Sequence, residues 1–193
     1  MNLNDIRTRL TESGANAANN KTTLREWLAT GSAVNFNVGL TVMPRKVFYK
    51  VKSARYGLKK NIILRHLNKE ELERASLRLV ALINTLVHKK AYKKYNKKLD
   101  IAMAIEGERG LCDLHTHFAI ALPGQVQSND FARIVRQALE MSGEFEIENA
   151  NFKQDKDSLD KKYSYKLDLV DCGWAKYITK DLDRKSFNSI YFP

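Results

Sequence analysis

The chain has 193 residues, 44% of them hydrophobic, and carries a formal net charge of +11 with an isoelectric point near 9.6. This hydrophobic content excludes an intrinsically disordered chain, and the length suits one domain with a sizeable core and an appended arm. A basic surplus of this size is typical of a surface that binds a polyanion, either a nucleic acid or an anionic membrane.

Three features that the sequence lacks limit where in the cell the protein is expected. The chain has no run of about 18 apolar residues, and its first residues lack the charged and apolar regions of a signal peptide. Cys112 and Cys172 are the only cysteines, too few for a secreted disulfide scaffold. We therefore expect a soluble intracellular protein in a reducing compartment, with no membrane partner.

Residues 1–33 contain two polar helical pieces and are predicted to form an N-terminal helical arm, whereas residues 34–193 form a single domain. Residues 34–43 alternate apolar and polar side chains and stop at Pro44, a pattern that predicts a strand. The stretch 45–67 that follows is crowded with Arg and Lys.

A long helix is predicted next. Asn68 followed by Glu71 resembles a capping box, and apolar residues then recur at helical spacing as far as Leu86. The basic end of this helix, residues 89–98, has two interpretations. It is either a solvated helix C-terminus or a contact with nucleic acid in which cations lie beside tyrosine rings.

The rest of the chain alternates strands and helices. Two strands, about 99–106 and 113–122, are joined by the turn-like segment Gly107-Glu-Arg-Gly110. The later elements are a helix, two strands and a last helix, at 131–141, 145–149, 163–170 and 173–182. This order predicts an α+β fold, with a ferredoxin-like or RRM-like antiparallel sheet of about five strands and helices mainly on one face.

The strand prediction places His115 and His117 on one face, because residues i and i+2 of a strand point the same way. A hairpin would bring Glu106, at the end of the preceding strand, beside them. Two nitrogens and one carboxylate oxygen, with open positions left, suit a divalent catalytic ion. The chain has four histidines, so two in alternation opposite a glutamate favour a metal site over isolated structural histidines.

Half of a zinc site at Cys112-x-x-His115 is an alternative, but no second pair completes a structural tetrahedron. Beside a polyanion-binding surface, the triad of Glu106, His115 and His117 suggests phosphodiester chemistry, with the ion polarising a phosphate oxygen. A tyrosine suits the role of nucleophile, because its phosphotyrosyl ester leaves a 3′-hydroxyl available for rejoining or priming.

These residues resemble the HUH endonucleases, especially the replication-initiator (Rep) branch of small rolling-circle replicons. Residues 34–43 resemble that family's first-motif strand, and Leu-His115-Thr-His117-Phe resembles its His-hydrophobic-His motif, with Glu106 upstream. Thr116 departs from the pattern, because the middle residue of the motif is usually bulky and apolar.

A Tyr-x-x-Lys motif is the third feature of the resemblance, and it matches at Tyr177 and Lys180 on the predicted last helix. The motif alone is common in this chain, which contains it five times. Three copies precede the His pair, whereas the family order places the tyrosine after it. Tyr163 also follows the pair but lies in a predicted strand, so Tyr177 is the preferred nucleophile and Tyr163 the alternative.

The resemblance implies that Tyr177 attacks a DNA phosphate, stays joined to the 5′-phosphate and releases a free 3′-hydroxyl. Lys180 would either neutralise charge near that phosphate or help to position the metal-bound group. The implied cofactor is Mg²⁺ or Mn²⁺. The implied partners are single-stranded DNA or an origin hairpin, a separate helicase and the replication machinery. The implied location is the cytoplasm of a bacterial or archaeal host, or the host nucleus for a eukaryotic virus.

Basic residues near the motifs are candidates for contact with the DNA backbone. They are Arg45, Lys46, Lys50, Lys52, Arg55, Lys89, Lys90, Lys93, Lys94 and Lys176. Tyrosines in the same segments would offer stacking platforms for bases, namely Tyr49, Tyr56, Tyr92 and Tyr95.

Three other functions fit part of the pattern. Asp113-Leu-His-Thr-His resembles the metal motif of PHP phosphoesterases and amidohydrolases, but those need further histidines and none follows His117. A single-tyrosine HUH transposase shares the His pair and the downstream tyrosine, although its helix usually offers Gln in place of Lys180. A non-catalytic nucleic-acid-binding module with an RRM-like sheet is the third, but the central strands carry Ala, Ile and His where stacking rings are expected.

Overall fold

The computed structural model describes residues 36–45, 47–54, 57–64, 67–107, 113–148, 164–170 and 190–191. The predicted N-terminal arm, most of the predicted turn at 107–110 and the predicted last helix lie outside these residues.

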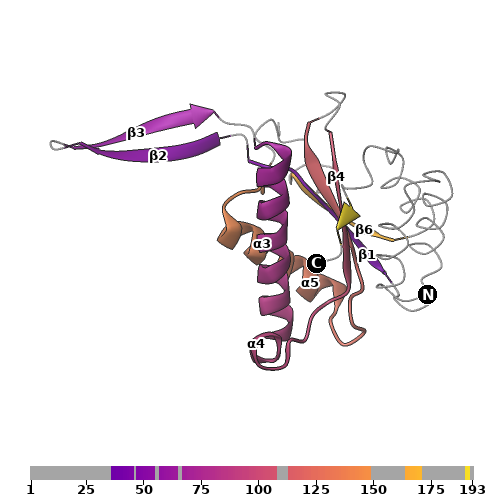
Figure 1. Cartoon of the computed structure of the whole chain (residues 1–193). Helices are drawn as coiled ribbons and strands as arrows, with labels where there is room; N and C mark the ends of the chain where they lie inside the picture. Colours follow the sequence, from indigo (N-terminus) through magenta and orange to yellow (C-terminus); the bar gives the residue numbers. More distant parts are fainter. Residues whose placement is uncertain are drawn as a thin grey trace, which may run out of the picture.

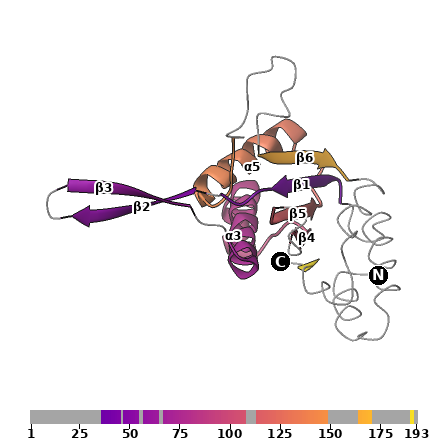
Figure 2. The same cartoon turned by 90° about the horizontal axis from the view of Figure 1, so that it is seen from above.

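Four antiparallel strands form the main sheet (Figure 1), and Figure 2 shows their order, β6-β1-β5-β4. Their bounds are Val38–Val42 for β1, Ile101–Glu106 for β4, His115–Ile120 for β5 and Tyr165–Leu169 for β6. A two-residue strand, β7 at Ile190–Tyr191, pairs with the other side of β4. The predicted α+β class with an antiparallel sheet is confirmed.

The strand register divides the sheet into two faces of different chemistry. Leu40, Phe118 and Met103 are aligned across β1, β5 and β4, and they are buried in the main hydrophobic core. The residues that alternate with them are small or polar, and we call the surface that they form the site face. Its members on these three strands are Gly39, Thr41, Ala102, Ala104, Glu106, His115, His117 and Ala119.

Two helices, α3 at Lys69–His88 and α5 at Ser128–Ser142, cover the opposite face of the sheet and pack against each other (Figures 1 and 2). The predicted capping box at the start of α3 is confirmed. The Asn68 side chain accepts a hydrogen bond from the Glu71 backbone N–H, and the Glu71 carboxylate accepts one from the Asn68 backbone N–H. Leu72, Ala75, Leu79 and Ile83 of the predicted stripe are fully buried, and Leu82 and Leu86 pack partly buried against the same core.

A short helix, α4 at Lys90–Tyr95, follows α3 and returns the chain to the sheet. Asn84, buried in α3, accepts a hydrogen bond of 2.7 Å from the Leu99 backbone N–H and thereby fixes the entry to β4. None of the helices in the described part of the chain is long and apolar enough to cross a lipid bilayer.

A separate two-stranded ribbon occupies the stretch in which the sequence predicted no strands. β2 at Val47–Ala54 pairs antiparallel with β3 at Gly57–Leu64, and the ribbon extends away from the sheet and the helices (Figures 1 and 2). Val, Phe, Tyr and Ile residues lie between the Lys and Arg residues of this stretch, and their β-propensity prevails.

The prediction of a strand at 145–149 is wrong. Phe145 instead forms an isolated bridge with Pro44, flanked by backbone hydrogen bonds from Arg45 N to Glu144 O and from Glu146 N to Met43 O. The ladder does not continue through Glu144, because its backbone N–H donates to the Ser142 hydroxyl. The segment therefore extends the line of β1 without forming a further strand.

Candidate metal centre

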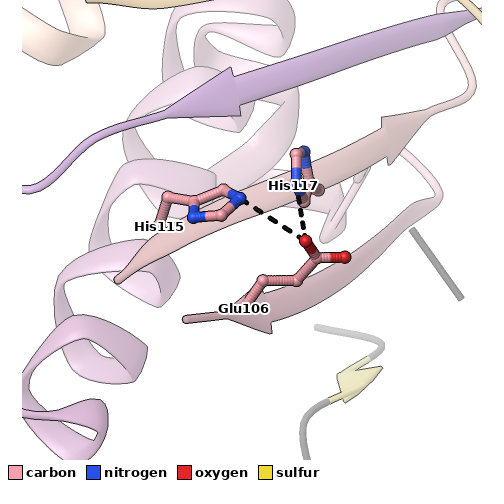
Figure 3. A group of neighbouring side chains, drawn as sticks. All are labelled: Glu106, His115 and His117. Atoms are coloured by element: carbon pink, nitrogen blue, oxygen red, sulfur yellow. Dashed lines mark ion pairs between the residues drawn. The ribbon is translucent and has the colours of Figure 1, made fainter. Parts of the chain in front are cut away.

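The three residues predicted to bind a metal come together at one end of the β4–β5 hairpin. Glu106 is the last residue of β4 and lies directly opposite His115, the first residue of β5. His117 follows two residues later on the same face of β5. Figure 3 shows both imidazole rings turned toward the Glu106 carboxylate. The convergence predicted from the sequence is thus confirmed.

The donor atoms are close and buried. The Nε2 atoms of His115 and His117 each lie 3.5 Å from Oε2 of Glu106. One donor atom from each residue lies within 4.8 Å of the other two, and the side chains of Glu106, His115 and His117 are only 3%, 10% and 2% exposed. Both 3.5 Å separations exceed the usual N–H···O hydrogen-bond length of about 2.7–3.2 Å.

A backbone carbonyl orients the ring of His115. Its Nδ1 lies 2.7 Å from the carbonyl oxygen of Asp113, and because a carbonyl can only accept, Nδ1 must donate. A neutral His115 therefore presents the lone pair of Nε2 to the Glu106 carboxylate. Two lone pairs that face each other at this distance repel, and a metal ion between them would relieve that repulsion.

A hydroxyl on the neighbouring strand orients the ring of His117. Thr41 on β1 lies directly opposite His117 in the register, and its Oγ1 is 2.8 Å from Nδ1 of that ring. Metal-binding histidines commonly use their second ring nitrogen in this way, to hold the first nitrogen toward the ion. The sequence analysis did not identify Thr41, because the adjacency of β1 and β5 is a tertiary feature.

A glycine lets the hairpin close tightly beside the site. Gly107, immediately after Glu106, has a φ of +100°, and a Cβ there would lie 2.7 Å from both the Asp113 carbonyl oxygen and Leu114 Cα. The sequence identified this glycine as a turn residue only. In the structure its missing side chain also makes room for the carbonyl that orients His115.

The donor set fits a divalent metal ion. Two atoms that each lie about 2.1 Å from an ion at the tetrahedral angle are about 3.4 Å apart, close to the 3.5 Å separations found here. Two imidazole nitrogens and a carboxylate oxygen suit Zn²⁺, Mn²⁺ or Fe²⁺, and they leave coordination positions open for water or a substrate. The triad can therefore hold a metal ion.

Several other predicted site residues lie outside the described residues. These are Tyr177, Lys180, Lys176, Lys46 and Arg55, together with the alternatives Tyr163 and Cys112. Arg45 is described and exposed just after β1, and its backbone N–H is bonded to Glu144. Lys50 and Lys52 lie in β2.

The basic residues at the junction of α3 and α4 and along α4 do not lie near the metal triad. Lys89, Lys90, Lys93 and Lys94 are exposed at the junction of α3 and α4 and along α4. The chain enters β4 from α4, and Glu106 is the final residue of β4, so the two sites lie at opposite ends of that strand (Figure 1). The structure does not bring these lysines to the triad.

No protein-family model, curated protein sequence or solved structure matches this chain.

Proposed function

We propose that this protein is an HUH-type tyrosine endonuclease that nicks and rejoins single-stranded DNA to initiate rolling-circle replication. One observation supports this above all. Glu106, His115 and His117 converge on one face of two adjacent antiparallel strands, in the order and spacing of the motif that the sequence resembles.

The strand order supports the finer fold that the function requires. We assign the body of the protein to the ferredoxin-like class, built from two β-α-β units that share one sheet. In chain order the elements are β1, α3, β4, β5, α5 and β6, and in space the strands follow as β6-β1-β5-β4. β1 and β4 are both antiparallel to β5, which lies between them, as a split unit demands.

Each member of the triad has a defined part in this proposal. His115 and His117 supply neutral nitrogens whose second ring nitrogens are held by the Asp113 carbonyl and the Thr41 hydroxyl. Glu106 supplies one negative charge, which leaves a divalent site with a net positive charge toward a DNA phosphate. A bound Mg²⁺ or Mn²⁺ would act as a Lewis acid on a phosphate oxygen.

Tyr177 is the proposed nucleophile. Its phenolate oxygen forms a bond to the phosphorus, the bond from phosphorus to the 3′-oxygen breaks, and that oxygen takes up a proton to become a free 3′-hydroxyl. Lys180 offsets negative charge at the phosphate during this exchange. The reverse reaction rejoins the strand, because the phosphotyrosyl ester conserves the energy of the broken bond.

The composition of the site face argues against a non-catalytic RRM-like module. Such modules stack bases on aromatic side chains of their central strands. The corresponding positions on β4 and β5 are Ala102, Ala104 and Ala119, beside the triad. These alanines are buried, so this face offers a buried metal site flanked by small residues in place of exposed stacking platforms.

A labelled single-stranded DNA pool tests the proposal. The full chain is incubated with Mn²⁺ and oligonucleotides of randomised sequence that carry a dye at the 3′ end, and a denaturing gel is run. We expect the dye to migrate with the protein, because the nucleophile keeps the 5′-phosphate of the downstream fragment. Oligonucleotides labelled at the 5′ end should give short products that a polymerase can extend.

Matched variants assign the nucleophile. Tyr177→Phe should abolish the protein-linked band, whereas Tyr163→Phe should retain it. Cleavage that yields no covalent species would replace the tyrosine mechanism with metal-dependent hydrolysis. Adduct that persists in Tyr177→Phe and disappears in Tyr163→Phe would transfer the role to Tyr163.

The proposal also sets the expected partners and place of action. Origin hairpins or single strands would be the substrate, and strand opening would depend on a separate helicase and the replication machinery. The protein would act in the cytoplasm of a bacterial or archaeal host, or in the nucleus of a eukaryotic host.

A further inference from the structure

The ribbon of β2 and β3 lies in the segment with most of the chain's excess positive charge. Residues 45–66 contain eight of the 33 Lys and Arg residues and none of the 22 Asp and Glu residues, so the rest of the chain has a surplus of only three. A projecting element with this charge density and no acidic residue indicates an anionic partner.

Charge within the ribbon is concentrated toward its turn. Lys52 and Lys59 lie directly opposite each other in the register, and Lys50 shares their face. Like charges in directly opposed positions destabilise an antiparallel pair. At the other end of the paired residues Val47 faces Leu64, and Arg45, Lys46 and Arg65 flank that end in the sequence. The paired lysines therefore lie toward the end of the ribbon that is farthest from the body, where a partner anion would relieve their repulsion.

The ribbon leaves the sheet at the end where the metal triad lies. β1 ends at Val42, whose partner in the register is Thr116, the residue between His115 and His117. β2 begins at Val47, five residues later. The ribbon is therefore the basic element of the described chain that starts beside the triad, while α4 lies at the other end of β4 (Figure 1).

We propose that the β2–β3 ribbon is a duplex-DNA-binding arm, which enters the major groove of double-stranded DNA next to the nicking site. The B-form major groove is about 12 Å wide and admits a two-stranded ribbon. Strands of eight residues reach about 26 Å, enough to cross that groove. The inference takes DNA as the partner from the proposed function, but it rests on the ribbon and not on the triad.

Two other anionic partners fit the ribbon less well. The major groove of double-stranded RNA is too deep and narrow for side chains to enter and read. An anionic membrane would favour apolar residues at the projecting tip, whereas the ribbon has its apolar pairs near the body and its lysines toward the turn.

Duplex binding without metal tests the arm. The full chain is titrated in EDTA against a labelled blunt duplex of about 20 base pairs, by fluorescence anisotropy over a series of salt concentrations. In the ribbon variant, four lysines are changed to glutamine: Lys50, Lys52, Lys59 and Lys60. In the matched control, the same charge is removed at exposed positions outside the ribbon that are not candidate DNA contacts: Arg74, Lys97, Lys98 and Arg133.

We expect the ribbon variant to raise the dissociation constant for duplex by about tenfold or more. The slope of log affinity against log salt concentration should also become shallower, by the amount that corresponds to about one lost phosphate contact or more. The control should change the dissociation constant by less than about threefold. The arm is rejected if the parent binds no duplex, if both variants lose affinity equally, or if phosphatidylserine vesicles bind more tightly through the same lysines.

A second variant covers the case in which four substitutions disturb the ribbon. Lys59→Glu places opposite charges at the facing positions, so the ribbon should be at least as stable while duplex affinity falls. The covalent-adduct assay on the parent protein is read separately. Duplex binding that depends on the ribbon, without any adduct, would reject the nicking function and retain the arm. Adduct formation without ribbon-dependent duplex binding would reject the arm alone.

Discussion

The hydroxyl of Thr116 lies 2.9 Å from the hydroxyl of Ser76, and both side chains are fully buried between β5 and α3. Thr116 stands between the two histidines of the triad and points toward the helices, while they point to the site face. The HUH resemblance leads one to expect a bulky apolar residue at this position. The buried hydroxyl partner accounts for the threonine, and the pair ties the histidine-bearing strand to α3.

Thr116→Val should lower the free energy of unfolding by about 1–3 kcal/mol, because the Ser76 hydroxyl then stays buried without this partner. The double variant Ser76→Ala/Thr116→Val removes both hydroxyls and should recover part of the loss. Urea unfolding of the parent, both single variants and the double variant gives the coupling energy. A coupling energy of zero would show that the two hydroxyls do not act as a pair.

Thr41→Val should weaken metal binding by about tenfold or more, since the ring of His117 loses the hydroxyl that orients it. Thr41→Ser keeps the hydroxyl and is the matched control. Isothermal titration with Mn²⁺ measures both affinities, and thermal melting checks that each variant folds. Equal affinities in the two variants would mean that the hydroxyl does not position the ring.

Gly107→Ala should lower the free energy of unfolding by about 1–3 kcal/mol, because a positive φ strains an alanine and the new methyl group meets the Asp113–Leu114 backbone. Metal affinity should fall as well, since the displaced Asp113 carbonyl orients His115. Gly124→Ala is the control, because a Cβ there meets nothing within 4 Å. Unchanged Mn²⁺ affinity in Gly107→Ala would show that the close approach at Gly107 does not help to orient His115 for metal binding.

Local patterns in the sequence were enough to predict the triad and the long helix. The alternation of His115 and His117, the turn at Gly107 and the capping box at Asn68 each depend on neighbours within a few residues. The structure confirms the alternation and the capping box, and it pairs β4 with β5 on either side of the turn, most of which lies outside the described residues. The antiparallel sheet with helices on one face followed from the order of those elements.

Features that depend on which strands become neighbours were not predictable from local patterns. Thr41 reaches His117 because β1 lies beside β5, and Ser76 reaches Thr116 because α3 crosses β5. The ribbon was missed for another reason, since lysines interrupt the apolar alternation that would mark its strands in the sequence. The tyrosine assignment stays a prediction, because Tyr177 lies outside the described residues.

His88 should make the fold less stable in mild acid. Burial, and secondly the charge of Lys97, lower the pKa of His88 from its ordinary 6.5, so the unfolded chain binds the proton more tightly than the folded chain does. The contribution of neutral His88 is complete above pH 6.5 and is lost as the pH falls below that value.

The matched comparison for His88 is the pH dependence of unfolding in His88→Gln. We expect this variant to lose less stability than the parent between about pH 6.5 and pH 5. Lys97→Gln removes only the second cause and should give an intermediate slope. Parallel curves for parent and His88→Gln would show that other groups, and not His88, set the acid sensitivity.

Added Mn²⁺ should raise the melting temperature of the parent chain through the triad. An ion at a hundred times its dissociation constant stabilises the folded state by about 2.7 kcal/mol, which corresponds to about 5–10 °C for a chain of this size. Glu106→Gln keeps the shape of the side chain but removes the anionic ligand, so the increase should largely disappear. Glu140→Gln, at an exposed position of α5, is the matched control and should respond like the parent. An equal increase in Glu106→Gln would place the ion elsewhere on the protein, and the metal assignment would then be wrong.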